Sequence, residues 1–271
     1  MNMVSNSPSL WREHLPRIGS ASNKYTRGHV VVFGGYPMTG AARLAARASA
    51  RAGAGMVSIA TASTALDSYL ASVESIMVTP VDTAEQFAAF AGSARVASVV
   101  VGPGAGVNEH TRSMVMAALS TGKPVVLDAD GLSAFASDAA TLCGATHDRC
   151  VMTPHEGEFA RLFSVEGSRD ERASAAAQMS GSVVVLKGAH TVVAGPSGEV
   201  VINDNAPATL ATAGSGDVLA GLIAALLAGG MTAFDAACAA VWIHSEAAAG
   251  GPPGLIADDL PELAAAVIAR L

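Results

Sequence analysis

The sequence predicts an α/β protein, a three-layer sandwich with a mainly parallel central sheet and helices on both faces. Short apolar runs rich in β-branched residues alternate along its 271 residues with alanine-rich segments of helical length. Several of these runs are continuously hydrophobic, which is typical of strands that helices cover on both sides. Because 51% of the residues are hydrophobic, the chain can bury a large core, and a disordered protein is excluded.

The apolar runs predict strands at His29–Phe33, Met56–Ala60, Ala97–Val101, Pro124–Asp128, Cys150–Thr153, Val183–Lys187, Thr191–Ala194 and Glu199–Ile202. The alanine-rich segments predict helices at Gly40–Ala52, Thr111–Ser120, Glu156–Phe163, Arg169–Met179, Asp217–Leu227, Ala233–Ala249 and Asp258–Leu271. The last two strands break the alternation. They are separated by Gly195-Pro196-Ser197-Gly198, which predicts a β-hairpin.

One domain is the simplest account of the chain, since no linker, fixed-period repeat or shift of composition divides it. We expect this domain to span residues 23–271. Residues 1–22 are polar and poorly periodic, so we expect a poorly ordered lead-in there.

Charge and composition argue against several classes of protein. With 16 Lys and Arg against 23 Asp and Glu the net charge is −7, and aromatic residues are only 4%, so nucleic-acid binding is disfavoured. The longest apolar run, Val218–Gly230, is too short to span a bilayer, and the first residues do not resemble a secretory signal. We therefore expect a cytoplasmic protein without a membrane partner. Its three cysteines include no CxxC pair and are interpreted as reduced and structural.

Candidate site residues follow the apolar runs, because ligands of open parallel sheets bind beyond the carboxyl ends of the strands. Glycine and carboxylate residues are frequent at these positions. The segments are Gly34–Gly40, Gly102–Gly106, Asp128–Gly131, Pro154–Glu158, Lys187–Thr191 and Thr212–Asp217.

The segment Thr212–Asp217 carries the sharpest signal, since its glycines lead directly into an apolar helix. Glycines let the backbone approach a ligand closely, and the unpaired amides of a first helical turn favour an anion. Asp217 in that turn could accept a proton from a hydroxyl that attacks a phosphoryl group. An Asp at a helix start is also a common N-cap, and spacing alone leaves both interpretations open.

The run Ala213-Gly214-Ser215-Gly216-Asp217 resembles the (G/A)xGD signature of the ribokinase-like superfamily. In that superfamily the Asp is the catalytic base and the preceding amides form the anion hole. Together with five further segments the chain resembles the ADP-dependent NAD(P)H-hydrate dehydratases, over nearly its whole length from Lys24 onward. Those segments are Gly35–Gly53, Val101–Gly104, Leu127–Leu132, Thr153–Glu158 and Leu186–Thr191.

This resemblance implies a ribokinase-like fold and a nicotinamide-repair reaction. The substrates would be NADHX and NADPHX, hydrated nicotinamides that bear a hydroxyl on C6, in their S epimer. ADP, or alternatively ATP, would phosphorylate that hydroxyl with Mg²⁺, and elimination of phosphate would restore NADH or NADPH.

The resemblance also implies roles for individual residues. Asp217 would be the base, with the amides of Gly214, Ser215 and Gly216 around the transferring phosphoryl group. The nucleotide would contact the run Lys187, Gly188, Ala189, His190 and Thr191, together with Gly216. The hydrated dinucleotide would contact Ala41, Gly104, His155 and Asp217. Without the resemblance, Lys187 is more simply interpreted as a solvated charge at a strand end.

His155 separates this chain from many ribokinase-like enzymes, which carry Asn-x-x-Glu at the corresponding place. Here a His replaces the Asn and Glu158 keeps the acidic position, which matches the dehydratase pattern. As bare sequence, a lone His beside a turn is more often structural. Glu158 and Asp128 are candidates to organise Mg²⁺ through water, and no direct protein ligand is expected. Asp130 is interpreted as an N-cap or turn residue.

Two other functions stay open on the sequence. One is a ribokinase-like kinase of a vitamin precursor, such as hydroxyethylthiazole or hydroxymethylpyrimidine. The other is a nucleotide-binding regulator that has kept the fold and lost catalysis. Retention of Asp217 and the glycines before it disfavours the regulator.

Expected partners follow from the resemblance as well. The epimerase that interconverts the two hydrates often precedes the dehydratase in one chain, and the residues before the resemblance here are too few to form it. We therefore expect dehydration without epimerisation, with a separate epimerase as functional partner. The resemblance also implies a homo-oligomer, specifically a tetramer.

Overall fold

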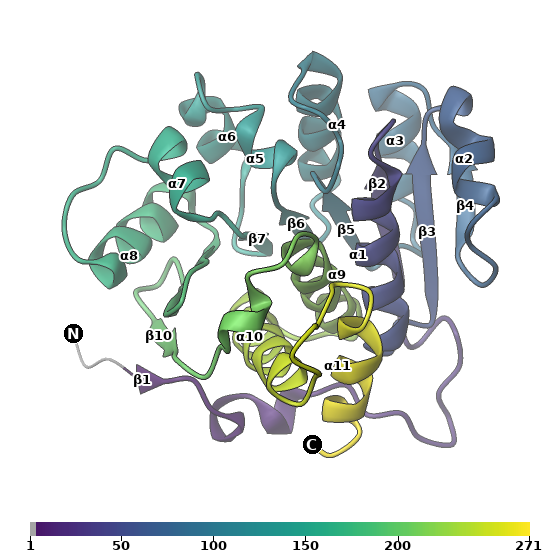
Figure 1. The fold of residues 1–271 in the computed structure, drawn as a ribbon. Helices are drawn as coiled ribbons and strands as arrows, with labels where there is room; N and C mark the ends of the chain where they lie inside the picture. Colours follow the sequence, from purple (N-terminus) through teal and green to yellow (C-terminus); the bar gives the residue numbers. More distant parts are fainter. Residues whose placement is uncertain (1–3) are drawn as a thin grey trace.

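The computed structural model describes residues 4–271, which form one mixed sheet between two layers of helices (Figure 1). The sheet has ten strands in the order β1-β10-β9-β8-β7-β6-β5-β2-β3-β4. Neighbouring strands run parallel except around β9, which is antiparallel to both β8 and β10. The predicted fold class and the predicted hairpin are confirmed.

All eight predicted strands are present, and no end differs from its prediction by more than one residue. They are β2 (His29–Gly34), β3 (Met56–Thr61), β5 (Ser98–Val101), β6 (Val125–Leu127), β7 (Cys150–Met152), β8 (Val183–Leu186), β9 (Thr191–Ala194) and β10 (Val200–Asn203). The structure adds two edge strands, β1 (Val4–Ser5) and β4 (Met77–Pro80).

The predicted helices are also present. They are α1 (Thr39–Arg51), α4 (Glu109–Ser120), α7 (Glu156–Leu162), α8 (Arg169–Ser180), α9 (Ser215–Ala228), α10 (Ala233–Ala249) and α11 (Leu260–Ile268). Four helices were not predicted, namely α2 (Leu66–Leu70), α3 (Ala84–Ala91), α5 (Asp130–Ser133) and α6 (Ala139–Ala145).

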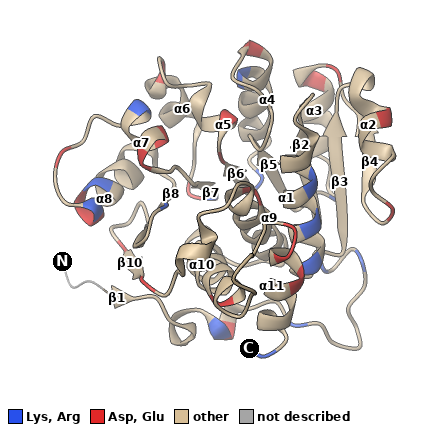
Figure 2. Cartoon of the chain, in the orientation of Figure 1, with Lys and Arg blue, Asp and Glu red and all other residues tan. Residues whose placement is uncertain are grey.

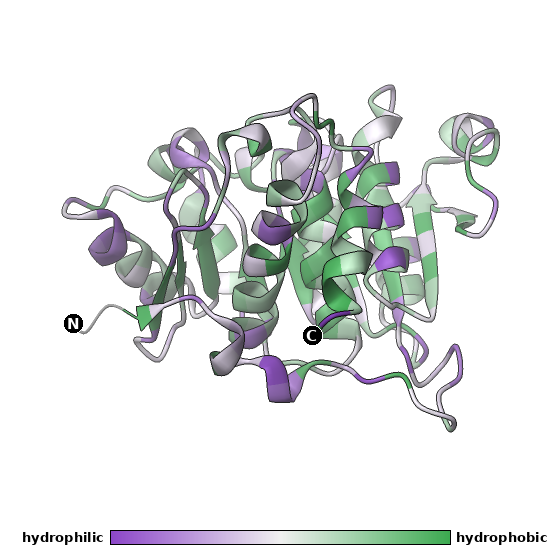
Figure 3. Ribbon diagram, turned by 60° about the horizontal axis from the view of Figure 1, so that its bottom comes forward, coloured by the Kyte–Doolittle hydropathy of each residue, from purple (hydrophilic) through white to green (hydrophobic). Residues whose placement is uncertain are grey.

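The core is divided by the sheet into two hydrophobic clusters, as the period of two along a strand requires. In β2, Val30 and Val32 belong to one cluster, whereas Val31 and Phe33 belong to the other. The first cluster includes residues of α1, α9, α10 and α11, and the second includes residues of α3, α4, α7 and α8. Colouring by hydropathy shows the apolar character of the strands and the polar outer turns of the covering helices (Figure 3).

Helix α9 lies unusually close to α1. A methyl group added at Gly221 would lie 2.1 Å from the carbonyl oxygen of Ala45, so only glycine fits there. The hydroxyl of Ser49 donates to the carbonyl oxygen of Gly221 at 2.9 Å and so links the two helices.

We expected a poorly ordered lead-in at residues 1–22, but residues 4–11 pack against the rest of the domain. Residues 1–3 lie outside the described residues. β1 pairs with β10, and Trp11 is only 1% exposed. Trp11 donates its indole N–H to Asn6 at 3.1 Å, and the Asn6 amide in turn donates to Asn203 at 2.9 Å. A buried aromatic anchor in a polar segment carries no periodic signal, which explains the error.

Arg47 and Arg51 recur on one exposed face of α1 (Figure 2). Both guanidinium groups pair with Glu262 of α11, at 2.7 and 2.9 Å. Such half-exposed pairs contribute little to stability, and here they mark the outer edge of the α1–α11 contact. None of the helices in residues 4–271 has the length and apolarity needed to cross a membrane.

Candidate active site

The candidate site lies at the carboxyl edge of the sheet, where the turn before α9 meets the ends of β6 and β8. A methyl group at Gly216 would lie 3.3 Å from Lys187 Nζ and 3.6 Å from Asp128 Oδ2. The start of α9 therefore faces a lysine from one strand end and a carboxylate from another. All three residues belong to the segments that the sequence analysis named as candidates because they follow apolar runs.

The turn before α9 depends on Gly214. This residue has φ +89°, and a methyl group there would lie 2.7 Å from Leu44 Cδ1 and 3.0 Å from Ala257 Cβ. The conformation and the space both require glycine. The Ser215 hydroxyl donates to the Leu210 carbonyl at 2.9 Å and fixes the turn from its other side.

Asp217 is not the N-cap of α9. The cap position belongs to Gly214, no side chain caps the helix, and Asp217 lies in the first turn. The amides of Gly216 and Asp217 pair with no backbone carbonyl among residues 4–271. The N-cap interpretation left open by the spacing is therefore wrong, and the free amides suit an anion.

The environment of Asp217 raises its pKa from 3.8 to about 7. Burial is the largest cause, the negative charges of Asp128 and Asp130 add to it, and the positive charge of Lys187 opposes it. A carboxylate with a pKa near neutrality can both accept and hold a proton at physiological pH. This is the property that a general base for an alcohol needs.

Lys187 is paired, which contradicts its interpretation as a solvated charge. Its Nζ donates to Asp128 Oδ1 at 2.6 Å, and Asp128 is 1% exposed. Burial works to lower the pKa of Lys187, but the charges of Asp128, Glu158 and Asp217 outweigh it and raise that pKa. The lysine stays protonated and leaves a fixed positive charge beside Gly216.

Asp130 plays a different part from Asp128. It is the first residue of α5, and its carboxylate accepts the amide of Gly106 at 2.8 Å. It thus ties the Gly102–Gly106 turn to the end of β6, as a turn residue was expected to do. Its charge still reaches Asp217, where it helps to raise the pKa.

His155 caps helix α7. Its Nδ1 accepts the amides of Gly157 and Glu158, at 2.9 and 3.2 Å, so the proton of the neutral ring is on Nε2. In return the Glu158 carboxylate accepts the His155 amide at 2.9 Å, which completes a capping box. The imidazole thus does the structural work that an Asn does at other helix starts, and its side chain is still 55% exposed.

Ala41 and Gly104 are neighbours at the start of α1. Gly104 has φ +63°, and a methyl group there would lie 2.4 Å from the Met38 carbonyl oxygen and 3.2 Å from Ala41 Cβ. Any contact that a ligand makes at these two residues uses the backbone or a small methyl surface. Leu44, one turn further along α1, lies against the Gly214 turn. The start of α1 and the start of α9 are therefore adjacent in the site.

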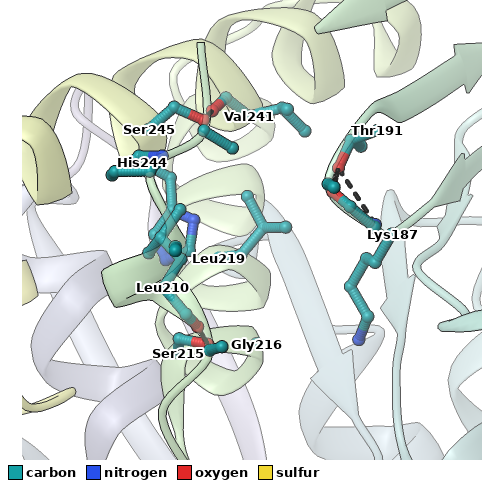
Figure 4. Close-up of a pocket in the computed structure, with 15 residues that line it drawn as sticks. Lys187, Thr191, Leu210, Ser215, Gly216, Leu219, Val241, His244 and Ser245 are labelled. Atoms are coloured by element: carbon teal, nitrogen blue, oxygen red, sulfur yellow. Dashed lines mark hydrogen bonds between the residues drawn. The ribbon is translucent and has the colours of Figure 1, made fainter. Parts of the chain in front are cut away.

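A cavity of about 520 Å³ opens beside the start of α9 (Figure 4). Four of the residues predicted to bind nucleotide in the β8–β9 turn line it, together with Gly216. They are Lys187, Gly188, Ala189 and Thr191. Thr191 closes this turn, because its hydroxyl donates to the Gly188 carbonyl at 3.0 Å. His190 does not line the cavity.

Sequence reasoning missed the far half of the cavity. It is lined by Ala206, Pro207, Ala208, Leu210, Ala211, Leu219, Val241, His244 and Ser245. The first five directly precede the Thr212–Asp217 segment, and that proximity is a signal that could have found them. The residues on α10 carry no such signal, since in sequence they are ordinary helix-core positions.

Asp128 and Glu158 are the carboxylates of the site that were expected to organise a metal ion. Among residues 4–271 no three His, Cys, Asp or Glu side chains gather as they would around a metal ion. Asp128 and Glu158 are each engaged already, with Lys187 and with the α7 cap. These carboxylates fit a magnesium ion that is carried by phosphates and water rather than by a cage of protein ligands.

Comparison with known proteins places this site in context. The family model described as NAD(P)H-hydrate dehydratase matches residues 29–264. A bifunctional NAD(P)H-hydrate repair enzyme of Salinibacter ruber is 37% identical over 266 residues, which cover 91% of this chain and 49% of that protein. The ADP-dependent (S)-NAD(P)H-hydrate dehydratase of Neisseria meningitidis is 38% identical over 255 residues, covering 88% and 84% of the two chains.

Among solved structures, the ADP/ATP-dependent NAD(P)H-hydrate dehydratase of Bacillus subtilis, co-crystallised with ATP and Mg²⁺, superimposes with a TM-score of 0.82. It is 26% identical, and the match covers 100% of this chain and 99% of that one. The chain spans about half the length of several of the curated relatives it matches, the bifunctional ones.

Proposed function

Because the chain belongs to the NAD(P)H-hydrate dehydratase family, we propose that it dehydrates the S epimer of NADHX and NADPHX with ADP as the phosphoryl donor. The proposal places this activity in residues 23–271 as a single domain. The observation that carries it is Asp217, a half-buried carboxylate with a pKa of about 7 in the first turn of α9, beside two free amides.

The first step is transfer of a phosphoryl group to the C6 hydroxyl. The hydroxyl oxygen attacks the terminal phosphorus of ADP, the bond to the bridging oxygen breaks, and AMP leaves. Asp217 takes the hydroxyl proton, while the amides of Gly216 and Asp217 stabilise the charge that spreads over the transferring group. Lys187 adds a fixed positive charge beside the same position.

The second step is elimination. Hydroxide is a poor leaving group and phosphate is a good one, so the C6–oxygen bond breaks and phosphate leaves. A proton is lost from C5 to solvent, and its C–H electron pair forms the C5–C6 double bond of the ring. No electron is gained or lost, and the product is the reduced nicotinamide itself. Mg²⁺ would supply neutralisation of the phosphate charges, and Asp128 and Glu158 are the carboxylates that would hold it through water.

Two further parts of the proposal concern partners. The relative from Neisseria meningitidis is named for the S epimer, which supports the view that a separate epimerase must convert the R epimer first. A homo-oligomer, in particular a tetramer, is proposed on family resemblance, and light scattering on the purified chain tests it.

The decisive experiment follows the absorbance of the reduced nicotinamide. The purified chain is incubated with NADHX, Mg²⁺ and either ADP or ATP, in parallel with Asp217→Asn. We expect recovery of NADH with the wild-type chain and a loss of at least about 100-fold in turnover for the variant, as is typical of removing a general base. No recovery with either nucleotide contradicts the proposal, and a phosphorylated product that accumulates without dehydration indicates a kinase instead.

A further inference from the structure

The cavity beside α9 is lined by five polar side chains, and four of them make hydrogen bonds within the chain. Lys187 donates to Asp128 at 2.6 Å, Thr191 to Gly188 at 3.0 Å, Ser215 to Leu210 at 2.9 Å and Ser245 to Val241 at 3.0 Å. The fifth is His244. Its Nε2 makes no hydrogen bond among residues 4–271.

One ring nitrogen of His244, Nε2, is buried in the protein without a hydrogen-bond partner among residues 4–271. His244 lies on α10 and is 7% exposed. Figure 4 shows it on the same side of the cavity as Leu210 and Leu219, opposite Lys187 and Thr191. A buried nitrogen without a partner costs free energy, so a ligand that supplies the missing hydrogen bond gains affinity.

The ring of His244 is uncharged. Burial is the largest cause and lowers its pKa to about 4. A hydrogen bond with the Ser215 backbone opposes this shift, and the positive charge of Lys187 adds to it. A neutral imidazole offers one donor and one acceptor, so the nitrogen that lacks a partner suits a neutral polar group rather than a phosphate. The phosphate end of the cavity is already supplied by Lys187 and the free amide of Gly216.

We propose that His244 recognises the nucleoside half of the bound nucleotide through a hydrogen bond to a neutral group of its sugar or base. The phosphates must lie near Asp217 for transfer, so the nucleoside extends into the rest of the cavity, where His244 offers a nitrogen without a partner among the described residues. The apolar wall of Pro207, Leu210 and Val241 covers the faces of the base. This inference rests on the proposed function only in taking an adenine nucleotide as the ligand of the cavity.

The test is a calorimetric titration of the purified chain, without NADHX, using ADP, 2′-deoxy-ADP, 3′-deoxy-ADP and inosine diphosphate. The protein is compared with His244→Phe, which keeps a ring of similar size without its nitrogens. His147→Phe is the matched control, because His147 is another imidazole whose buried Nε2 has no partner, and it does not line the cavity.

We expect the wild-type chain to prefer ADP over at least one analogue by roughly 3–10-fold, the usual value of one neutral hydrogen bond. His244→Phe should lose that preference and His147→Phe should keep it. Loss of the preference against a deoxy analogue assigns the contact to the sugar, and loss against inosine diphosphate assigns it to the base. A preference that survives in His244→Phe overturns the inference, as does a wild-type chain that binds all four ligands equally.

A measurement on the wild-type chain covers the case in which His244→Phe does not fold. The ring nitrogens of His244 should change their ¹⁵N chemical shifts when ADP is added to saturation, and unchanged shifts overturn the inference. The outcomes also separate the two proposals. A chain that shows the preference but does not dehydrate NADHX sinks the proposed function alone, whereas one that dehydrates while His244→Phe keeps every preference sinks this inference alone.

Discussion

Replacing Asp128 by Asn should move the pH dependence of the reaction toward acid. The negative charge of Asp128 is one of the causes that raise the pKa of Asp217 to about 7. A nearby like charge shifts a carboxyl pKa by roughly 1–3 units, and Lys187 neutralises part of the Asp128 charge, so we expect a shift of about 1 unit. Since the base must be deprotonated, activity rises with pH through this pKa, and Asp128→Asn should be active at lower pH than the wild type.

Lys187→Met provides the opposite perturbation. The positive charge of Lys187 lowers the pKa of Asp217. Removing it should therefore move the midpoint of the pH–activity curve toward alkali, by a similar amount of about 1 unit. The assay is kcat/KM for NADHX at saturating ADP across the neutral range. The bound nucleotide acts on all three proteins alike, so the difference between midpoints isolates the two side chains.

Both variants also lose absolute activity, because each breaks a buried ion pair at the site. The midpoint, not the rate, is therefore the readout. If the two midpoints move in the same direction, or if neither moves, then Asp217 is not the group that titrates and the electrostatic reasoning fails.

Three further predictions concern stability and the backbone. Gly214→Ala introduces a side chain at φ +89° and 2.7 Å from Leu44. We expect the free energy of unfolding to fall by about 1–3 kcal/mol in denaturant unfolding, and turnover to fall in the dehydratase assay. Unchanged stability and turnover would show that the turn is adaptable. Trp11→Ala should destabilise the protein by about 3–5 kcal/mol, and a value below about 1 kcal/mol would restore the picture of a loose lead-in. Asp217→Asn should be more stable than the wild type at alkaline pH, and this difference should shrink toward acid pH. The folded-state pKa of Asp217 is raised from 3.8 to about 7, so wild-type stability falls as pH rises through that window by up to about 4 kcal/mol, and a variant whose melting temperature tracks the wild type at every pH would contradict this.

Continuous apolar runs made the central strands predictable, because strands covered on both faces leave an unbroken signal. β4 gave a weaker one, since its four residues are partly or fully exposed and it ends in Pro80 at the sheet edge. Helix α3 did carry a usable signal that was overlooked. Thr83 and Gln86 form a capping box at its start, and the Thr-x-x-Gln spacing is visible in the sequence.

The candidate site was predictable where glycines and charges follow strands, as with Gly216, Lys187 and Asp128. What the sequence could not decide was the state of each group. The choice between base and N-cap for Asp217 depends on whether Gly214 or a side chain closes the turn, which is a matter of backbone geometry. His244 was out of reach altogether, because only the packing of α10 beside the cavity gives it a role.

The tight seating of α9 on α1 has a consequence for how the site works. Gly221 leaves no gap between the two backbones, and Ser49 links them by a hydrogen bond near the middle of α9. If the proposed function holds, the amides at the start of α9 are oriented toward the phosphoryl group before any ligand binds, so no binding energy is needed to orient them. These amides would contact only the phosphoryl group, so they would not distinguish one alcohol substrate from another. Substrate specificity would then depend on the residues around them.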